Sequence, residues 1–573
     1  MSVSDFFRPA QVRTSGLGGG QACVLLILIC IAMFLPGFTS LPPMDRDEPR
    51  FAQATKQMLE TGDYVAIRFQ EEARNKKPVG IYWMQAAVVS AGERLGVPEA
   101  RTKIWLYRLP SLAGAIATVL LTYWAALGLG APGTAFLAGL LMASCILLGV
   151  EARLAKTDAV VAATVVAAMG VLARLWMSHA STRGWKLPAI FWTAMGIGLL
   201  VKGPITPMVP LLAAIGLGLS IRSASWLRPL RPMIGLAWCL LIVLPWFVLI
   251  MKATNGAFLS DSIGGDMLGK VAGGQEEHGA PPGTYLAVFL GSAWPMGPFF
   301  LMALPFFWRE RSDAAVSFLL AWLVPSWILF ELVPTKLPHY VLPLYPAIAI
   351  LTAIAIERNA VSLRRHFAFL IGWLVPAVPL LLVLIGTGQG IWFGMSPGPI
   401  YLIGAAVVLG LVWTAGQALL ARDSARLLST ALALTVATYV MTWAGFFGGT
   451  LFAPFDLSER LAAARQRALG AVPECSSLKI ATTQYREPSL VFLTGTDLVM
   501  TDGAGAARFL AEGPCRIVFV PQRDEADFRD AGADPAHTRL LERVSGINLN
   551  GGRPLDIGLY LGQGEAHEPA STR

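Results

Sequence analysis

The sequence has few charged residues for its length. Only 14% of its 573 residues are Asp, Glu, Lys or Arg, whereas soluble domains carry roughly 25%. A soluble core needs a polar surface, so this scarcity argues against a soluble protein. Apolar residues make up 55% of the chain and mean hydropathy is +0.57, which indicates a polytopic membrane protein.

Cysteine is scarce as well, and the six cysteines show no metal-binding spacing. Four of them lie in apolar runs, where we expect inert packing residues: Cys23, Cys30, Cys145 and Cys239. Cys475 and Cys515 lie in the polar C-terminal part, where a disulfide is expected only if that part is extracytoplasmic. The formal net charge of +8 does not indicate nucleic acid as a partner, because cytoplasmic loops of membrane proteins carry excess Lys and Arg.

The apolar runs predict thirteen membrane spans, each near the roughly 20 residues that a bilayer requires. They lie at 21–41, 104–128, 132–150, 158–178, 188–202, 205–221, 232–251, 286–307, 314–333, 340–356, 367–387, 398–420 and 427–450. The first run lacks a small-x-small cleavage site, so we expect no cleavable signal peptide. The shorter amphipathic stretch 79–95 carries Gln85 and predicts a helix on the membrane surface.

Basic residues of the short loops indicate the sidedness. With residues 1–20 in the cytoplasm, the inner loops carry basic residues such as Arg222, Arg228, Arg364 and Arg365. An odd number of spans then places loops 42–103 and 252–285, and the part 451–573, outside. In that last part β-type runs (LKIATT, RIVFV, IGLYLG) alternate with helical stretches (SERLAAARQRAL, GAARFLAEG, EADFRDAG). They predict a small extracytoplasmic α/β domain.

The polar stretch from Leu41 to Trp83 follows the first span directly and carries candidate catalytic carboxylates, Asp45, Asp47 and Glu48. Carboxylates at a membrane surface can serve in general acid–base catalysis. The alternative is a solvated turn that begins a helix at Pro49. Lys76 and Lys77 follow about thirty residues later.

Charged residues also gather at span ends on the outer side, against the positive-inside pattern. They are Arg153, Lys156, Asp158, Lys202, Lys336, His339 and, as an aromatic neighbour, Tyr340. Together with Lys77 they predict a cationic bowl at headgroup level, whose ligand is a lipid phosphate or pyrophosphate. Each has a plainer alternative: a basic residue that reaches the interface, caps a helix C-terminus, or belongs to an aromatic belt.

The outer loop 252–285 is long and Gly-rich, so we expect a mobile substrate lid. It contains Glu276, Glu277 and His278, which offer oxygen and imidazole ligands for a divalent metal. Three adjacent polar residues are a weak metal signal, and a lid without metal is the alternative.

Several motifs together resemble one family: RDEPRFA, NKKPVGIYW, YRLPSLAG, RLAKTDA, LVKGP, EEHGAPPG, KLPHYVLPLYPA and YREPSLVFLTG. In this order, from about residue 41 to 495, the chain resembles the ArnT-like (aminoarabinose transferase) branch of the GT-C membrane glycosyltransferases, which are related in fold to protein O-mannosyltransferases. The resemblance implies thirteen spans, a periplasmic α/β domain, and an undecaprenyl-phosphate sugar donor used on the periplasmic face of a bacterial inner membrane.

The resemblance also implies roles for individual residues. Asp47 matches the first-loop catalytic Asp, Asp158 the second acidic position, Lys77 the Lys that meets donor phosphate, and Tyr340 a phosphate-contacting Tyr. We assign Glu48 to the catalytic group, Lys202, Lys336 and Arg153 to phosphate binding, and His278, His339 and Tyr82 to the substrate or lid, with His278 and Glu277 as metal candidates. The chain departs from the family at Lys76 and after His278, so the metal and the sugar stay open.

The function predicted from these residues is transfer of a sugar, with inversion, from a polyprenyl phosphate to a lipid A or lipopolysaccharide-type acceptor. Asp47 activates or positions the acceptor, and Lys77 stabilises the departing lipid phosphate. A protein O-glycosyltransferase is the alternative within enzymes. A lipid-linked sugar flippase is the alternative outside them, although a transporter places its ionisable residues at mid-membrane.

Overall fold

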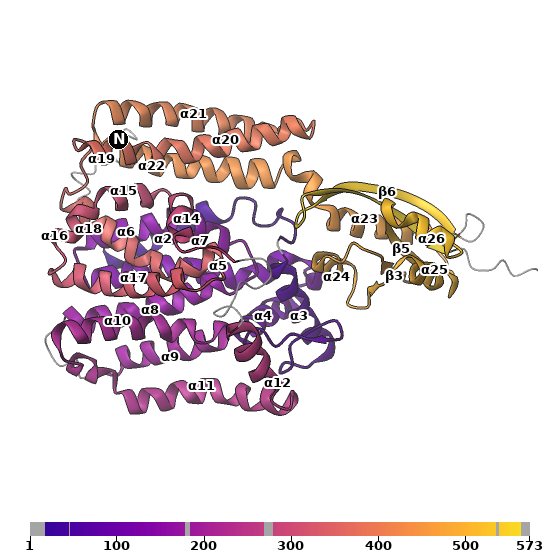
Figure 1. Cartoon of the computed structure of the whole chain (residues 1–573), viewed down its shortest axis with the longest axis horizontal. Helices are drawn as coiled ribbons and strands as arrows, with labels where there is room; N and C mark the ends of the chain where they lie inside the picture. The colour runs from indigo at the N-terminus through magenta and orange to yellow at the C-terminus, as the bar shows by residue number, and fades with distance from the viewer. Residues whose placement is uncertain (1–17, 45, 178–183, 269–278, 534–537, 563–573) are drawn as a thin grey trace, which may run out of the picture.

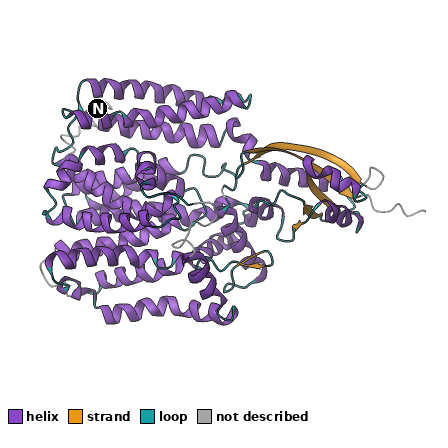
Figure 2. Cartoon of the chain, viewed as in Figure 1, coloured by secondary structure: helices purple, strands orange, loops and turns teal. Residues whose placement is uncertain are grey.

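The computed structural model describes residues 18–44, 46–177, 184–268, 279–533 and 538–562. A bundle of helices is followed by a C-terminal domain that contains a five-stranded sheet, and Figure 2 shows how sharply the two parts differ in secondary structure. The long helices of the bundle run roughly parallel or antiparallel to one another (Figure 1). The chain is therefore a helical membrane protein with a C-terminal α/β domain.

Each apolar run identified in the sequence coincides with helix. The bundle contains α2 (Gly19–Phe34), α5 (Ile104–Leu127), α6 (Pro132–Ser144), α7 (Ile146–Glu151), α8 (Asp158–Met177), α9 (Lys186–Lys202), α10 (Ile205–Ile221), η4 (Ser225–Leu230), α11 (Pro232–Ala253), α14 (Thr284–Ser292), α15 (Met296–Met302), α16 (Leu304–Arg309), α17 (Ala314–Leu332), η6 (Pro338–Leu344), α18 (Tyr345–Glu357), α19 (His366–Gly372), α20 (Leu374–Trp392), α21 (Pro399–Leu420), α22 (Ser424–Tyr439), η7 (Val440–Phe447) and η8 (Thr450–Phe455). Pro295 and Pro305 stand where the run 286–307 breaks into short helices, because proline cannot continue the helical hydrogen bonds.

Within the described residues, eight helical segments are long and apolar enough to cross a membrane, and three shorter apolar helices accompany them. The number of thirteen spans therefore stays a prediction. Helices α8 and α18 are buried along most of their length, whereas α11, α20 and α21 turn large apolar side chains outward. Lipid tails are apolar, so side chains that face a bilayer must be apolar too. A helix also meets the other requirement of a bilayer, because it satisfies its own backbone polar groups.

The polar stretch after the first span folds between the bundle and the C-terminal domain (Figure 1). It contains α3 (Asp47–Thr61), the short hairpin β1 (Arg68–Phe69) and β2 (Glu72–Ala73), α4 (Gly80–Arg94) and η3 (Ala100–Thr102). The helix predicted at 79–95 is confirmed as α4, and its place at the membrane surface stays a prediction. The loop after α11 forms α12 (Ala257–Leu259) and a π-helix, η5 (Ser260–Leu268).

The C-terminal domain is a mixed sheet with helices on both faces. Its elements are α23 (Leu457–Gly470), β3 (Lys479–Thr482), α24 (Pro488–Thr494), β4 (Val499–Met500), α25 (Gly503–Ala511), β5 (Arg516–Pro521), η9 (Gln522–Asp524), α26 (Glu525–Asp530), β6 (Thr538–Asn548) and β7 (Arg553–Gly562). The strand order is β4-β3-β5-β7-β6, with β4, β3 and β5 parallel and the β6–β7 hairpin antiparallel. Cys475 and Cys515 form a disulfide beside β3 and β5. The α/β character predicted for this part is confirmed.

Candidate active site

A completely buried ion pair between Glu48 and Arg108 fixes the polar stretch. Arg108, on α5, donates to both carboxylate oxygens of Glu48, at 2.8 and 3.0 Å. Its other N–H groups donate to three carbonyl oxygens of the connection after α2, those of Phe38, Leu41 and Pro42. Glu48 also accepts from the backbone N–H groups of Met44, at 2.6 Å, and Ala155, at 2.8 Å. Glu48 therefore has no surface left for a substrate, in contrast to its expected catalytic role.

Asp47 is different, although it is the next residue along the chain. It begins α3, and 43% of its side chain is exposed. The guanidinium of Arg74 lies 3.9 Å from its carboxylate and also stands over the ring of Phe51, 5.2 Å from the ring centroid. Phe51 in turn packs against Tyr82 of α4, with ring centroids 5.4 Å apart. Burial raises the pKa of Tyr82, and the charge of Arg74 opposes that rise. Asp47 thus combines an accessible carboxylate with a nearby cation.

A cluster of ionisable side chains lies where α7, α8, α9 and η6 meet, and we call it the Asp158 cluster. Lys202, at the end of α9, forms an ion pair with Asp158, at the start of α8. His339 Nε2 lies 3.9 Å from Asp158, and its Nδ1 lies 3.7 Å from Glu151. The ammonium of Lys156 is 3.5 Å from the same Glu151 oxygen. Two carboxylates and two ammonium groups therefore balance one another in a buried site.

Two further predicted residues adjoin the Asp158 cluster. The Lys202 ammonium stands over the ring of Tyr340, 4.9 Å from its centroid, which is a cation–π contact. Lys77 is one of the cations whose charge acts on His339, together with Lys156 and Lys202. Lys77 is partly exposed, whereas Lys202 is nearly buried. The structure thus brings Asp158, Lys202, His339 and Tyr340 together from three distant segments, and Lys77 lies close enough for its charge to act on His339.

Arg153 and Lys336, both expected to bind phosphate, are engaged elsewhere. Arg153 is completely buried and donates to the carbonyl oxygens of Met33, Pro36 and Gly149. Its guanidinium also lies 4.3 Å from the ring centroid of Trp443. The Lys336 ammonium donates to the carbonyl oxygens of Ala280, at 3.0 Å, and Val333, at 2.7 Å. Both cations thus satisfy carbonyl groups of helix ends and loops.

The metal candidates Glu277 and His278 lie outside the described residues. Among the residues that are described, no group of three or more His, Cys, Asp or Glu side chains is placed to hold a metal ion. The described start of the outer loop does contact the site region, because Asn75 donates to Asp261 at 2.9 Å. That hydrogen bond joins the segment before Lys77 to the expected lid.

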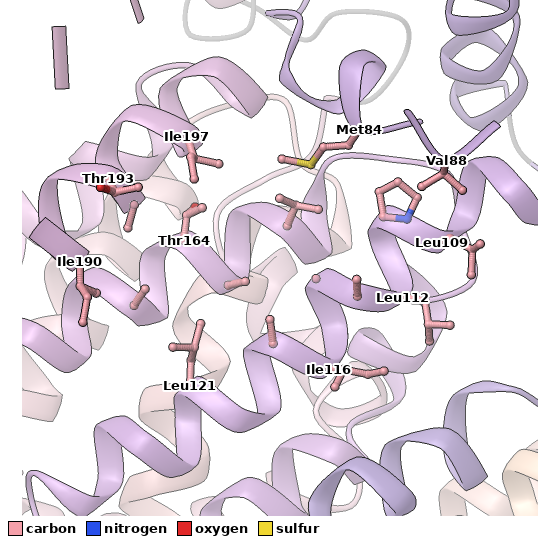
Figure 3. A pocket seen from close by; sticks show the side chains of 18 of the residues that line it. Met84, Val88, Leu109, Leu112, Ile116, Leu121, Thr164, Ile190, Thr193 and Ile197 are labelled. Carbon is pink, nitrogen blue, oxygen red and sulfur yellow. The ribbon is translucent and has the colours of Figure 1, made fainter. Parts of the chain in front are cut away.

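An apolar cavity of about 1070 Å³ opens between α4, α5, α8 and α9. In Figure 3 its labelled side chains point toward a common space from these helices. They include Met84 of α4, Leu121 of α5, Thr164 of α8 and Ile197 of α9. The cavity wall also includes Val160, which lies two residues after Asp158 on α8. The cavity and the polar cluster therefore share helix α8, with the cluster at its first turn and the cavity along the turns that follow.

The C-terminal domain is docked on α3 through α24. Phe492 of α24 is completely buried among residues of α3, α4 and α5, and it meets Tyr107 edge to face, with centroids 5.2 Å apart. Lys56 of α3 is buried and donates to the carbonyl oxygen of Phe492 at 3.0 Å. Burial lowers the pKa of Lys56, and Glu60 opposes that shift. The domain is thereby part of the support for the helix that begins with Asp47.

Several of these contacts involve residues that the sequence reasoning did not select: Arg108, Glu151, Arg74 and Phe492. All four lie in or beside motifs that carry the family resemblance, YRLPSLAG, RLAKTDA, NKKPVGIYW and YREPSLVFLTG. The motifs themselves therefore pointed to the segments in which these residues lie. The partner of each residue, however, lies far away in the sequence and is visible only in the fold.

Comparisons with known proteins point to one fold. ArnT from Cupriavidus metallidurans in the apo state superposes with a TM-score of 0.71 at 16% identity, covering 94% of this chain and 97% of that one. The chain has the ArnT-like GT-C fold. An ArnT-like structure of the same organism, bound to undecaprenyl phosphate, gives the same TM-score at 17% identity. The apo oligosaccharyltransferase of Archaeoglobus fulgidus matches more distantly, with a TM-score of 0.51 at 11% identity over 89% of this chain and 70% of that one.

Two sequence relatives of this ArnT-like chain share the name undecaprenyl phosphate-alpha-4-amino-4-deoxy-L-arabinose arabinosyl transferase. The protein from Erwinia tasmaniensis is 29% identical over 315 residues, 54% of this chain and 54% of the relative. The one from Pseudomonas aeruginosa is 28% identical over 381 residues, 64% of this chain and 66% of the relative. The chain thus aligns with about half to two thirds of the length of these relatives. No protein-family model matches it.

Proposed function

We propose that this protein is a membrane glycosyltransferase that takes a sugar from a polyprenyl-phosphate donor and transfers it to a lipid A or lipopolysaccharide-type acceptor. One observation carries the proposal: the buried ion pair of the Asp158 cluster stands at the start of α8, and the following turns of the same helix line a large apolar cavity that is open between helices. A ligand with an anionic head and a long apolar tail suits that combination. The undecaprenyl phosphate bound to the related ArnT supports the same carrier.

In this proposal the apolar cavity binds the isoprenoid chain of the donor, and the Asp158 cluster and its neighbours bind the phosphate. The isoprenoid chain occupies the space lined by Met84, Leu121 and Ile197. The phosphate lies toward Lys77 and Tyr340, beside the Lys202 ammonium, which Asp158 already orients. Because Lys202 is paired and nearly buried, the more accessible Lys77 supplies most of the charge that meets the phosphate.

The reaction is a single displacement at the anomeric carbon. An acceptor oxygen forms the new bond while the bond from that carbon to the phosphate oxygen breaks, and the electron pair leaves with the lipid phosphate. Asp47 accepts the acceptor proton or holds the acceptor for attack. Lys77 stabilises the charge on the leaving phosphate. One displacement inverts the sugar configuration. Glu48 and Arg108 hold the backbone around Asp47 in place rather than react.

The outer, periplasmic face is supported by the charge distribution and by the disulfide. Disulfides form in oxidising compartments such as the bacterial periplasm, and Cys475 pairs with Cys515 in the C-terminal domain. That domain packs directly on α3, which carries Asp47. Asp47 and the disulfide therefore lie on the same side. Among the relatives, a transferase name recurs, which favours an enzyme over a flippase.

The test supplies purified protein in detergent with a radiolabelled polyprenyl-phosphate sugar and a lipid A acceptor. The wild-type protein should yield labelled lipid A, and Asp47→Asn should yield none while it still binds donor. Asp63→Asn is the matched control, because an amide oxygen can still accept the two turn hydrogen bonds that Asp63 makes with Val65 and Ala66. Failure of the wild-type protein to form any covalent product, with every candidate acceptor, would contradict the proposal and favour a transporter.

A further inference from the structure

A much smaller cavity lies at the junction between the C-terminal domain and the segment just before α3. It measures about 220 Å³. Three arginines from three separate segments line it: Arg46 before α3, Arg523 in η9 and Arg553 at the start of β7. Two side-chain amides, those of Gln484 and Asn548, complete the polar part of the wall. This cavity is distinct from the apolar one and from the Asp158 cluster.

The charges around this arginine cavity leave an excess of positive charge. Arg46 lies 3.7 Å from Glu487, and Arg523 lies 3.9 Å from Asp524. Both carboxylates already accept shorter hydrogen bonds from other side chains, at 2.6 Å in each case. The two acids thus face three guanidinium groups, and both of these contacts are longer than a hydrogen bond. Half or nearly half of the Arg46 and Arg523 side chains is exposed, at 56% and 49%.

The position of the arginine cavity relates it to the reaction. Arg46 immediately precedes Asp47, so the cavity is formed in part by the same segment that carries the proposed acceptor-activating carboxylate. Arg523 and Arg553 belong to the C-terminal domain, and Phe492 and Lys56 fix that domain on α3. The cavity therefore depends on the docked domain, and its arginines are held in one place although they come from distant parts of the chain.

We infer that the arginine cavity binds an anionic group, a phosphate ester or a carboxylate, carried by the acceptor. Guanidinium groups bind phosphate and carboxylate through paired, charge-assisted hydrogen bonds, and three of them around one small space match such a group. The volume suits a headgroup rather than a whole lipid. The site then holds the acceptor close to the segment that carries Asp47, while the donor occupies the separate apolar cavity. The acceptor role rests on the proposed function; the anion binding does not.

The test measures binding of two probes to full-length protein. Glycerol phosphate is a soluble phosphate ester, and nanodiscs of phosphatidylglycerol present the same group on a lipid, with phosphatidylcholine nanodiscs as the reference. The variant Arg523→Gln/Arg553→Gln removes two cavity arginines. The matched control, Arg508→Gln/Arg539→Gln, removes two exposed arginines of the same domain that do not line the cavity.

We expect the cavity variant to bind glycerol phosphate and phosphatidylglycerol at least about tenfold more weakly, since a hydrogen bond to a charged group contributes about 1.5–3 kcal/mol and 1.4 kcal/mol is tenfold. The control variant should bind both probes as the wild type does. Equal losses in both variants would show general surface electrostatics and overturn the inference. So would a loss of phosphatidylglycerol binding alone, because it would identify a membrane-facing patch instead of a cavity.

Transfer assays separate this inference from the proposed function. If the protein binds glycerol phosphate through Arg523 and Arg553 but forms no glycosylated product, the anion site stands and the transferase proposal fails. If it transfers sugar, the cavity variant should raise the acceptor KM about tenfold or more and leave the donor KM unchanged. An unchanged acceptor KM would overturn the acceptor role.

Discussion

Replacing Glu48 with glutamine separates a structural carboxylate from a reacting one. The side chain is completely buried and receives four hydrogen bonds, two of them from Arg108. Glutamine has the same shape, but it removes the negative charge and turns an NH2 group toward donors. Arg108 is then a buried cation without its counter-charge. Breaking a buried ion pair in this way costs about 3–5 kcal/mol, which is roughly two to four orders of magnitude in the unfolding equilibrium.

The assay is thermal unfolding of the detergent-solubilised protein, followed by size-exclusion fluorescence, with transfer measured on the fraction that stays folded. Glu48→Gln should unfold at a clearly lower temperature, and Glu72→Gln, an exposed glutamate of the same polar stretch, should not. In the double variant Glu48→Gln/Arg108→Gln no buried charge is left alone, so its loss of stability should be smaller than the sum of the single losses. A Glu48→Gln protein as stable as the wild type but without transfer would refute the reasoning and make Glu48 a reacting group.

Three further substitutions test the donor site and the docked domain. Lys77→Met should raise the donor KM at least about tenfold, since a charged hydrogen bond to phosphate is lost, and the adjacent Lys76→Met should not; equal effects would reassign Lys77 to general surface charge. Leu121→Trp fills part of the apolar cavity and should weaken polyprenyl-phosphate binding, whereas Leu241→Trp, at an exposed position of α11, should leave it unchanged. Phe492→Ala should cost about 3–5 kcal/mol of docking and speed hydrogen exchange in α3; unchanged exchange would contradict a supporting role for the C-terminal domain.

The helices of the membrane part were predictable because each apolar run is long enough to demand one conformation. Every run that the sequence defines coincides with helix, and the prolines at 295 and 305 stand where the run 286–307 is broken. The runs 132–150 and 367–387 are also divided, each into two helices. The α/β domain was predictable for a similar reason, since short apolar runs alternate with amphipathic ones. Strand β6 and helix α24 were not selected, because neither has a pattern that distinguishes it from a loop.

The candidate site was only partly predictable, because a charged residue at a helix end does not reveal its partner. Lys202 pairs with Asp158, and the charge of Lys77 acts on the neighbouring His339, while the roles of all three stay predictions. Arg153 and Lys336 have the same sequence character, yet they donate to carbonyl oxygens exposed where helices end. The carbonyl oxygens that need such donors are those at helix ends, and only the fold determines which side chain reaches them. Nothing in the amino-acid sequence separates a cation that serves the backbone from one that serves a ligand.

The measurement that tests the central claim most directly is photo-crosslinking with a polyprenyl phosphate that carries a photoreactive group in its isoprenoid chain. Peptides mapped by mass spectrometry should come from α4, α5, α8 and α9, around Met84, Leu121, Thr164 and Ile197, and Lys77→Met should reduce the labelling. Labelling concentrated instead on the outward surfaces of α11, α20 and α21, and unaffected by Lys77→Met, would contradict the account.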